Sequence, residues 1–243
     1  MKKTGVAVAL LVALGSVAAC SDQRAPSEHT ATTNAPIQGG SDDGTAHPFA
    51  VGFCIDVPGN GTVDCNNLNV DICSGALIAP NLVVTARHCV QNTDKQIDCA
   101  SSVFSGQLAN NFYVTTDPTF TGATHWHTVS SINVPTPTSV CGNDIALLTL
   151  QDDVPAAEAT PITPVVQYPM TTHPMYSRQV TAVGYGATQA GTNPPGAGTR
   201  RIKGAIPIEC VVGDTDFAGC DTVFDSGTID PKEFITGDGT CQG

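Results

Sequence analysis

The 243-residue chain has few charged and few aromatic residues: Asp, Glu, Lys and Arg make up 13% of it, and Phe, Trp and Tyr 5%. Long apolar segments with a helical period are also lacking, so the sequence offers little that would build a helical protein. Lysine and arginine number only 10 against 22 acidic residues, and the formal net charge is −12. Binding to nucleic-acid phosphates needs clustered positive charge, so we expect no nucleic-acid partner.

Glycine (24 residues) and proline (17 residues) are abundant. Together with Asn and Asp they interrupt many short runs of Val, Ile, Thr and Ala. Such runs are typical of β-strands separated by turns. A chain of this length can bury a sizeable core, either as one larger domain or as two small ones. We therefore predict an all-β protein.

Residues 1–20 have the form of an export signal. Lys2 and Lys3 precede an apolar run over residues 5–14, which is too short to span a bilayer as a mature helix. The run leads into Ser-Val-Ala-Ala-Cys, which resembles the lipobox of bacterial lipoproteins, where the cysteine, here Cys20, is lipidated after cleavage. The alternative is an ordinary secretory signal cleaved after Ala19. Both interpretations export the protein.

Residues 21–36 are polar and poor in apolar side chains, which is typical of a flexible tether or propeptide. We therefore expect a lipoprotein signal peptide over residues 1–20, a tether over residues 21–36 and a folded domain over residues 37–243. The protein would be anchored to the bacterial cell envelope only through a lipid on Cys20, or it would be extracellular.

Cysteines are frequent after the signal. The nine that follow Cys20 are Cys54, Cys65, Cys73, Cys89, Cys99, Cys141, Cys210, Cys220 and Cys241. In an oxidising compartment such a set usually forms disulfides. Their spacing is irregular and contains no CxxC pair, so it does not indicate a zinc site. The odd number leaves one cysteine to pair with a residue outside this set.

The stretch CSGALIAPNLVVTARHCV, residues 73–90, contains the first candidate for chemistry. Two apolar runs separated by a Pro-Asn turn lead into Ala86, Arg87, His88 and Cys89. A histidine between a strand end and a disulfide is rigidly placed, as a general base must be. A lone histidine beside a cysteine is more often structural, so this stretch needs support from elsewhere in the chain.

The second candidate lies in CGNDIALLTL, residues 141–150, where Asp144 precedes an apolar run typical of a buried strand. A buried carboxylate is costly unless it is paired, and a histidine N–H is a suitable partner. The alternative is that Asp144 only ends a turn. Both stretches resemble motifs of the chymotrypsin/trypsin-like serine peptidases, T-A-A-H-C and D-I-A-L-L, in the same order. The resemblance implies that His88 and Asp144 are two members of a catalytic triad.

The same resemblance bears on Arg87 and on the disulfides. Arg87 stands where alanine is commoner in that family, and we expect its side chain to project outward. The spacing of Cys73 and Cys89 fits the family's disulfide across the histidine loop. For the other cysteines we predict the pairs Cys54–Cys65, Cys99–Cys141 and Cys210–Cys220, with Cys241 left over.

The resemblance covers residues 37–243 and implies two antiparallel Greek-key β-barrels. Residues 37–40, IQGG, resemble the family's mature start I-V-G-G, so Ile37 would be the mature N-terminus. Pro36 precedes it where Arg or Lys is usual. Residues 183–188, VGYGAT, resemble the G-W-G strand of the second barrel.

The stretch Cys241-Gln242-Gly243 resembles the start of the family's C-x-G-D-S-G-G-P segment. By this resemblance Gly243 supplies one N–H of the oxyanion hole. Gly239 would form the floor of the S1 pocket, which favours small or apolar P1 residues. We expect the nucleophilic serine and the last strands to follow Gly243, so that the second barrel is incomplete in this chain and the chain itself is inactive.

Other candidates are weaker. Ser226, in FDSGT, lacks the Gly-Gly-Pro tail of a nucleophile motif, and Ser74 lies in a predicted strand, so we expect neither to be the nucleophile. His125 and His127 fall on one face of a strand but have no third ligand nearby, which favours an exposed strand over a metal site. No glycine loop of the phosphate-binding type occurs. We expect no cofactor and no metal.

The function predicted is therefore an exported serine endopeptidase, monomeric, with protein or peptide substrates. One alternative is a non-catalytic serine-protease homologue that acts as an exported protein-binding module. Another is a β-barrel binding module whose motifs only imitate the family. That last alternative predicts that His88 and Asp144 lie far apart.

Overall fold

The computed structural model describes residues 37, 39–56, 65, 71–94, 97–108, 111–167, 176–188, 196–211, 214 and 234–236. Several residues to which a role was assigned lie outside this part of the chain: Cys20, Cys220, Ser226, Gly239, Cys241 and Gly243. Within the described residues, no helix is long and apolar enough to cross a membrane.

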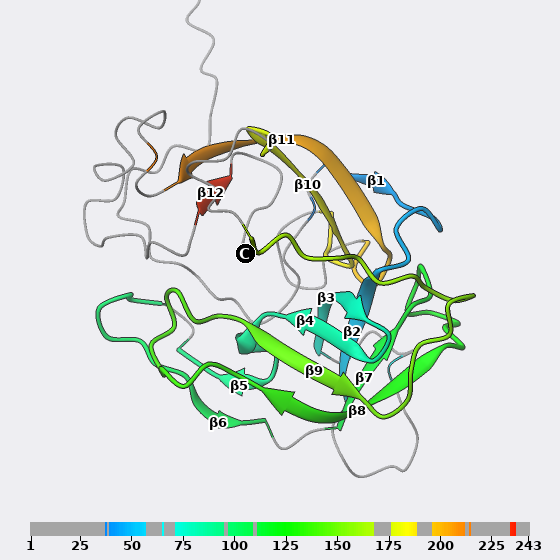
Figure 1. The fold of residues 1–243 in the computed structure, drawn as a ribbon, viewed down its shortest axis with the longest axis horizontal. Coiled ribbons are helices and arrows are strands. Elements are labelled where there is room, and N and C mark those ends of the chain that lie inside the picture. The colour runs from blue at the N-terminus through cyan, green and yellow to red at the C-terminus, as the bar shows by residue number, and fades with distance from the viewer. Residues whose placement is uncertain are drawn as a thin grey trace, which may run out of the picture.

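The larger half of the molecule is a closed antiparallel barrel, drawn in the lower part of Figure 1. Its strands, in barrel order, are β2 (Ala50–Asp56), β3 (Asp71–Ala79), β4 (Leu82–Thr85), β9 (Ala146–Leu150), β8 (Trp126–Asn133) and β7 (Asn111–Thr115). Burial alternates along β4 and β9, as expected for strands with one face on the core. Phe53, Leu77, Val83 and Leu148 are among the residues that fill the interior.

The second sheet lies above the barrel in Figure 1. It consists of β1 (Ser41–Asp42), β10 (Gln179–Gly184), β11 (Arg201–Val211) and β12 (Phe234–Thr236), with β11 paired to the other three. In the described part of the chain this sheet is open. A short ladder of β5 (Gln91–Asn92) and β6 (Ser105–Gln107) stands beside the barrel, and η1 (Arg87–Cys89) is a single 3-10 turn. The all-β prediction is confirmed.

A buried arginine connects the two halves. Arg200 precedes β11, and its side chain is only 1% exposed, as is that of its ion-pair partner Asp43 at 3.0 Å. Its remaining N–H groups donate to the carbonyl oxygens of Gly44, Ala50 and Thr116 and to the hydroxyl of Tyr185. These acceptors come from the N-terminal segment, the barrel and the second sheet, so one guanidinium holds all three together.

Disulfides join Cys54 to Cys65, Cys73 to Cys89 and Cys99 to Cys141, which confirms three of the predicted pairs. Cys210 is also disulfide-bonded. Its predicted partner, Cys220, lies outside the described residues.

Candidate active site

Strand pairing brings His88 and Asp144 to the same end of the barrel. β4 and β9 are antiparallel neighbours, and Thr85 at the end of β4 faces Ala146 at the start of β9. Asp144 lies just before β9 and His88 just after β4, in the turn η1. Two residues far apart in the sequence are thus placed opposite each other by the ladder itself.

The two side chains are in direct contact. The His88 Nδ1 and Asp144 Oδ2 atoms are 2.7 Å apart, and the backbone N–H of His88 donates to Asp144 Oδ1 at 2.8 Å. One carboxylate therefore holds both the ring and the backbone of the histidine. About a third of the His88 side chain is exposed (34%), so the ring remains accessible from solvent. The alternative that Asp144 only ends a turn does not account for this contact.

Burial alone would raise the pKa of the Asp144 carboxyl. The hydrogen bond from His88, the charge of that ring and the backbone N–H groups of His88 and Arg87 outweigh burial and hold the pKa below its ordinary value of 3.8. Asp144 is therefore ionised at neutral pH. An ionised carboxylate accepts a hydrogen bond from Nδ1–H, and Nε2 of the ring is then free to accept a proton.

The disulfide Cys73–Cys89 joins β3 to the turn of His88 and fixes its position against the barrel. The cysteines and His88 also form a group with metal-ligand spacing, but both sulfur atoms are already bonded to each other. The neighbouring Ser74 lies in β3, as predicted, and its hydroxyl oxygen accepts the Tyr185 N–H at 2.8 Å. Ser74 therefore bridges the barrel and the end of β10.

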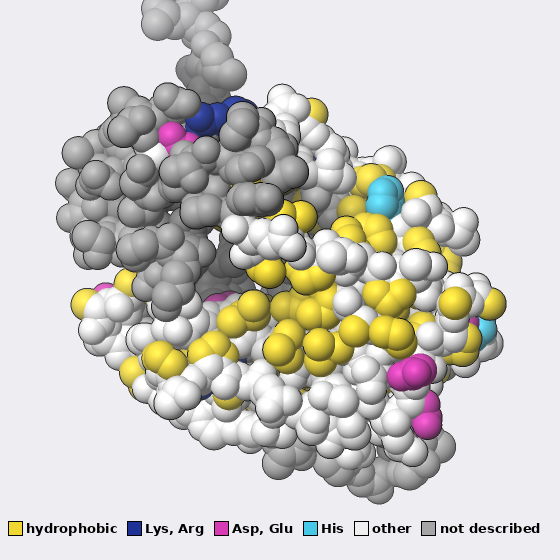
Figure 2. Space-filling model, in the orientation of Figure 1, with side chains coloured by type: hydrophobic (Ala, Val, Ile, Leu, Met, Phe, Trp, Pro, Cys, Tyr) yellow, Lys and Arg dark blue, Asp and Glu magenta, His cyan; other side chains and the backbone are white. Residues whose placement is uncertain are grey.

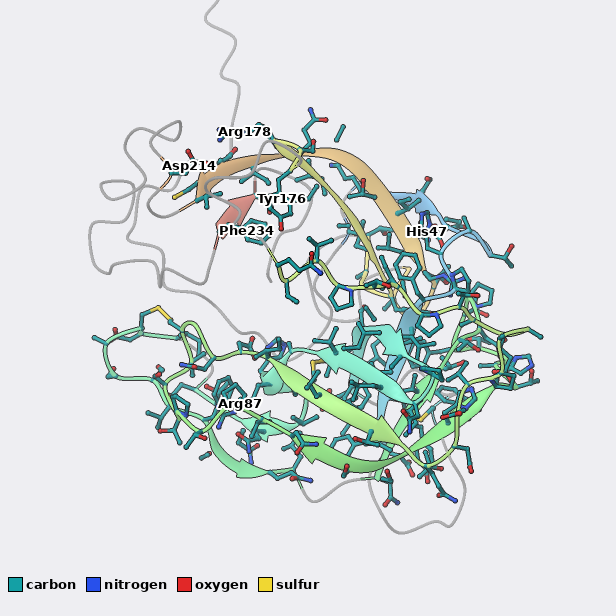
Figure 3. All side chains as sticks on the ribbon, viewed as in Figure 1. His47, Arg87, Tyr176, Arg178, Asp214 and Phe234 are labelled. Atoms are coloured by element: carbon teal, nitrogen blue, oxygen red, sulfur yellow. A yellow bond between two sulfur atoms is a disulfide. The ribbon has the colours of Figure 1, made fainter. Side chains whose placement is uncertain are left out.

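The prediction for Arg87 is wrong. Its side chain does not project outward: the residue is only 3% exposed and lies on the β5 side of the helical turn (Figure 3). The Nε group donates to the Gln91 side chain at 2.7 Å, Nη1 donates to the Pro137 carbonyl at 2.6 Å, and the guanidinium stacks over the Phe104 ring. Hydrogen-bond acceptors from other parts of the chain compensate the burial of the Arg87 side chain. The five-residue motif around His88 contains no sign of these acceptors.

The two histidines of the HWH stretch each contact a different carboxylate. His125 Nδ1 lies 2.7 Å from Asp117 Oδ1, and His127 Nε2 lies 2.9 Å from Glu158 Oε2. His125 is exposed as predicted, but the His127 side chain is only 12% exposed, so the prediction of an exposed strand is wrong there. Hydrogen bonding to Asp117 and its charge raise the pKa of His125.

The remaining described candidate is Ile37. It is buried, and its carbonyl accepts the N–H of Gly40 at 3.2 Å. A Cβ on Gly184 would lie 3.6 Å from the Ile37 Cδ1 atom, so this residue packs at the end of β10. The sequence did not indicate that two arginines are buried: Arg87, which lies beside the site, and Arg200, which lies between the two halves. A basic residue in a strand-rich segment carries no local signal that it will be buried.

The structure thus combines a closed antiparallel barrel, a second sheet and a paired His88 and Asp144 at one end of the barrel. Residues 44–209 match the family model described as Trypsin, and the chain belongs to that family. The match contains both His88 and Asp144 and excludes the alternative that the motifs only imitate the family. No curated protein matches the chain. Members of the family are serine peptidases with protein or peptide substrates, and disulfides are typical of proteins in oxidising compartments.

Proposed function

We propose that the protein is an exported serine endopeptidase in which His88 is the general base and Asp144 orients it. The contact of 2.7 Å between His88 Nδ1 and Asp144 Oδ2 carries this proposal. A hydrogen bond at Nδ1 selects the tautomer whose Nε2 can accept a proton, and about a third of the His88 side chain is exposed to solvent.

In the proposed mechanism His88 takes the proton from a serine hydroxyl as that oxygen attacks the scissile carbonyl. His88 then gives the proton to the leaving amine. Asp144 keeps the imidazole in place and stabilises the imidazolium that forms between the two transfers. The low pKa of Asp144 suits this part, because only the ionised carboxylate stabilises a positive ring.

We propose that the nucleophilic serine belongs to the segment that begins at Cys241, whose first residues match the family's C-x-G-D-S-G-G-P pattern. Gly243 would then donate one N–H to the oxyanion, a contribution of about 3 kcal/mol to the transition state. Gly239 at the S1 floor would favour small or apolar P1 residues. By this proposal a chain that carries the serine segment cleaves protein substrates.

The remaining assignments complete the proposal. Residues 1–20 form a lipoprotein signal and residues 21–36 a tether, with lipid on Cys20 anchoring a monomer to the cell envelope. Ile37 becomes the mature N-terminus of a domain that starts there. Mass spectrometry tests both assignments: the anchored form should carry lipid on Cys20, and the form cut before Ile37, which the cleavage releases from the anchor, should begin at Ile37.

The decisive experiment compares the gene product that includes the serine segment with three variants, using a protein substrate and an active-serine phosphonate probe. His88→Ala and Asp144→Asn should each lower kcat on the order of 10⁴-fold. His125→Ala is the matched control, because His125 also lies 2.7 Å from an aspartate but outside the site. Activity that survives His88→Ala would refute the mechanism, and a cleavage profile dominated by Arg and Lys at P1 would refute the role of Gly239.

A further inference from the structure

We propose that Arg87 is a positioning residue for the His88–Asp144 pair. Its guanidinium connects the turn that carries His88 to the loop that carries Asp144. The inference rests on the proposed function and deepens it, since it names a residue beyond the pair on which the geometry of that pair depends.

The burial of Arg87 is the first argument. Arg87 is only 3% exposed, so its guanidinium loses most of its hydration, which costs several kcal/mol unless the protein replaces it. The replacement here consists of the Gln91 side-chain oxygen, the Pro137 carbonyl oxygen and the face of the Phe104 ring, 4.4 Å from the guanidinium carbon. A merely space-filling side chain at this position would need no polar partners.

The places from which these partners come are the second argument. Gln91 follows the His88 turn directly in β5, whereas Pro137 belongs to the loop between β8 and β9 that ends at Asp144. The bond from Arg87 Nη1 to the Pro137 carbonyl, at 2.6 Å, therefore joins two segments 50 residues apart in the chain. The backbone N–H of Arg87 also contributes to the lowered pKa of Asp144.

The loop of Asp144 has other attachments. The disulfide Cys99–Cys141 and the backbone bond from the Val140 N–H to the Ser102 carbonyl connect it to the segment before β6. Asp144 itself binds the ring and the backbone N–H of His88. The Arg87 side chain adds a further link between this loop and the turn of His88, and this link does not depend on the pair itself.

Charge is the third argument. Both hydrogen-bond acceptors of the Arg87 side chain are neutral, whereas the negative charge of Asp144 acts on the guanidinium and opposes the effect of burial, which lowers the pKa of Arg87. The attraction is mutual, so the buried cation stabilises Asp144 as the carboxylate that the pair needs.

The test uses the chain printed above and needs no catalysis. A strong Nδ1–H···carboxylate hydrogen bond gives a far-downfield proton signal in the NMR spectrum, which reports the His88–Asp144 contact directly. Arg87→Met should broaden this signal beyond detection at temperatures where the variant is folded, and should raise the pH midpoint of the Asp144 carboxyl carbon. Arg87→Lys, which keeps the charge but cannot reach both Gln91 and Pro137, should restore the carboxyl midpoint and only part of the proton signal.

Arg201→Met is the matched control, since Arg201 is also mostly buried but pairs with Asp42 in the second sheet. It should leave the downfield signal intact. If Arg87→Met does not fold, Gln91→Leu, which removes one acceptor only, should weaken the signal instead. An unchanged signal and an unchanged Asp144 midpoint in folded Arg87→Met would overturn the inference and leave the proposed function standing. Absence of the downfield signal from the unsubstituted chain would count against the proposed function itself.

In the gene product with the serine segment, Arg87→Met should affect KM and kcat differently. Arg87 is buried and its guanidinium contacts Gln91, Pro137 and Phe104, so KM should stay within about twofold. A displaced general base costs transition-state stabilisation, and kcat should fall on the order of 10- to 100-fold. An equal fall in kcat for Arg201→Met would show that the loss reflects stability alone.

Discussion

Replacing Arg200 by methionine should be among the most damaging changes that the described part of the chain can undergo. Methionine has a similar length but no charge and no donors. The substitution would leave the Asp43 carboxylate, whose side chain is 1% exposed, without its partner at 3.0 Å. It would also remove the N–H groups that donate hydrogen bonds to the carbonyl oxygens of Gly44, Ala50 and Thr116.

Removing one partner of a buried ion pair costs about 3–5 kcal/mol, because the other charge is left uncompensated. The whole free energy of unfolding of a domain is about 5–15 kcal/mol. Arg200→Met should therefore remove a third or more of the stability. Arg178→Met is the control. Arg178 also pairs with an aspartate, Asp214 (Figure 3). The Arg178 side chain is half exposed, so solvent screens this pair and its loss should cost less than that of the fully buried pair.

Urea unfolding with intact disulfides measures the difference. Burial raises the pKa of Asp43, but its bonds to His47 and Arg200 outweigh that effect and lower it from 3.8. A lowered pKa contributes stability above the ordinary value and loses it as the pH falls through the folded value. The difference in free energy of unfolding between the unsubstituted chain and Arg200→Met should therefore become smaller below about pH 4. A loss under 1 kcal/mol at pH 7, or a gap that is independent of pH, would refute the reasoning.

Two further predictions concern stability. Removing the disulfide of Cys99 and Cys141 by a double alanine substitution frees a loop of 42 residues and should cost about 4 kcal/mol, measured by thermal unfolding; an unchanged Tm would contradict it. Tyr185→Phe removes a bond of 2.6 Å to the Asp117 carbonyl and should cost about 1–2 kcal/mol in urea. Burial raises the pKa of Tyr185 to about 12, so its contribution is complete below pH 10 and is lost as the pH rises toward 12, a loss that Tyr185→Phe should not show.

The parts of the structure that could be predicted are those encoded in short stretches. The strands follow from apolar runs broken by turn residues, and the contact of His88 with Asp144 follows from two motifs of ten to eighteen residues. The Cys73–Cys89 bond belongs to the same pattern. Each of these features has its evidence within one segment of the chain.

The parts that could not be predicted depend on partners far away in the sequence. Arg200 is buried because Asp43, 157 residues earlier, is buried with it. Arg87 is buried because Pro137 offers a carbonyl, and His127 is covered because Glu158 approaches it from another loop. A charged residue usually lies at the surface. The partner that allows it to be buried is distant in the sequence, so the residues around it do not indicate burial.

The outer surface carries exposed apolar side chains. Side chains of hydrophobic residues form a band over β9 and the connection to β10 in Figure 2, and Ile145, Val165 and Val166 are among the exposed apolar residues of the chain. A low content of charged residues thus has a visible effect on one face. Nothing in the composition indicated where that face would be.

The ion pair of Arg200 with Asp43 limits how far the amino-terminal residues of the domain can extend. Asp43 is immobilised, and β1, which precedes it, is paired to β11, so only residues 37–40 could swing if a new amino terminus were made at Ile37. Gly39 has a φ of +68° and is followed by Gly40, so the arm can pivot. Four residues extend about 14 Å at most. The ammonium group of a newly formed Ile37 terminus therefore stays within that radius of Ser41.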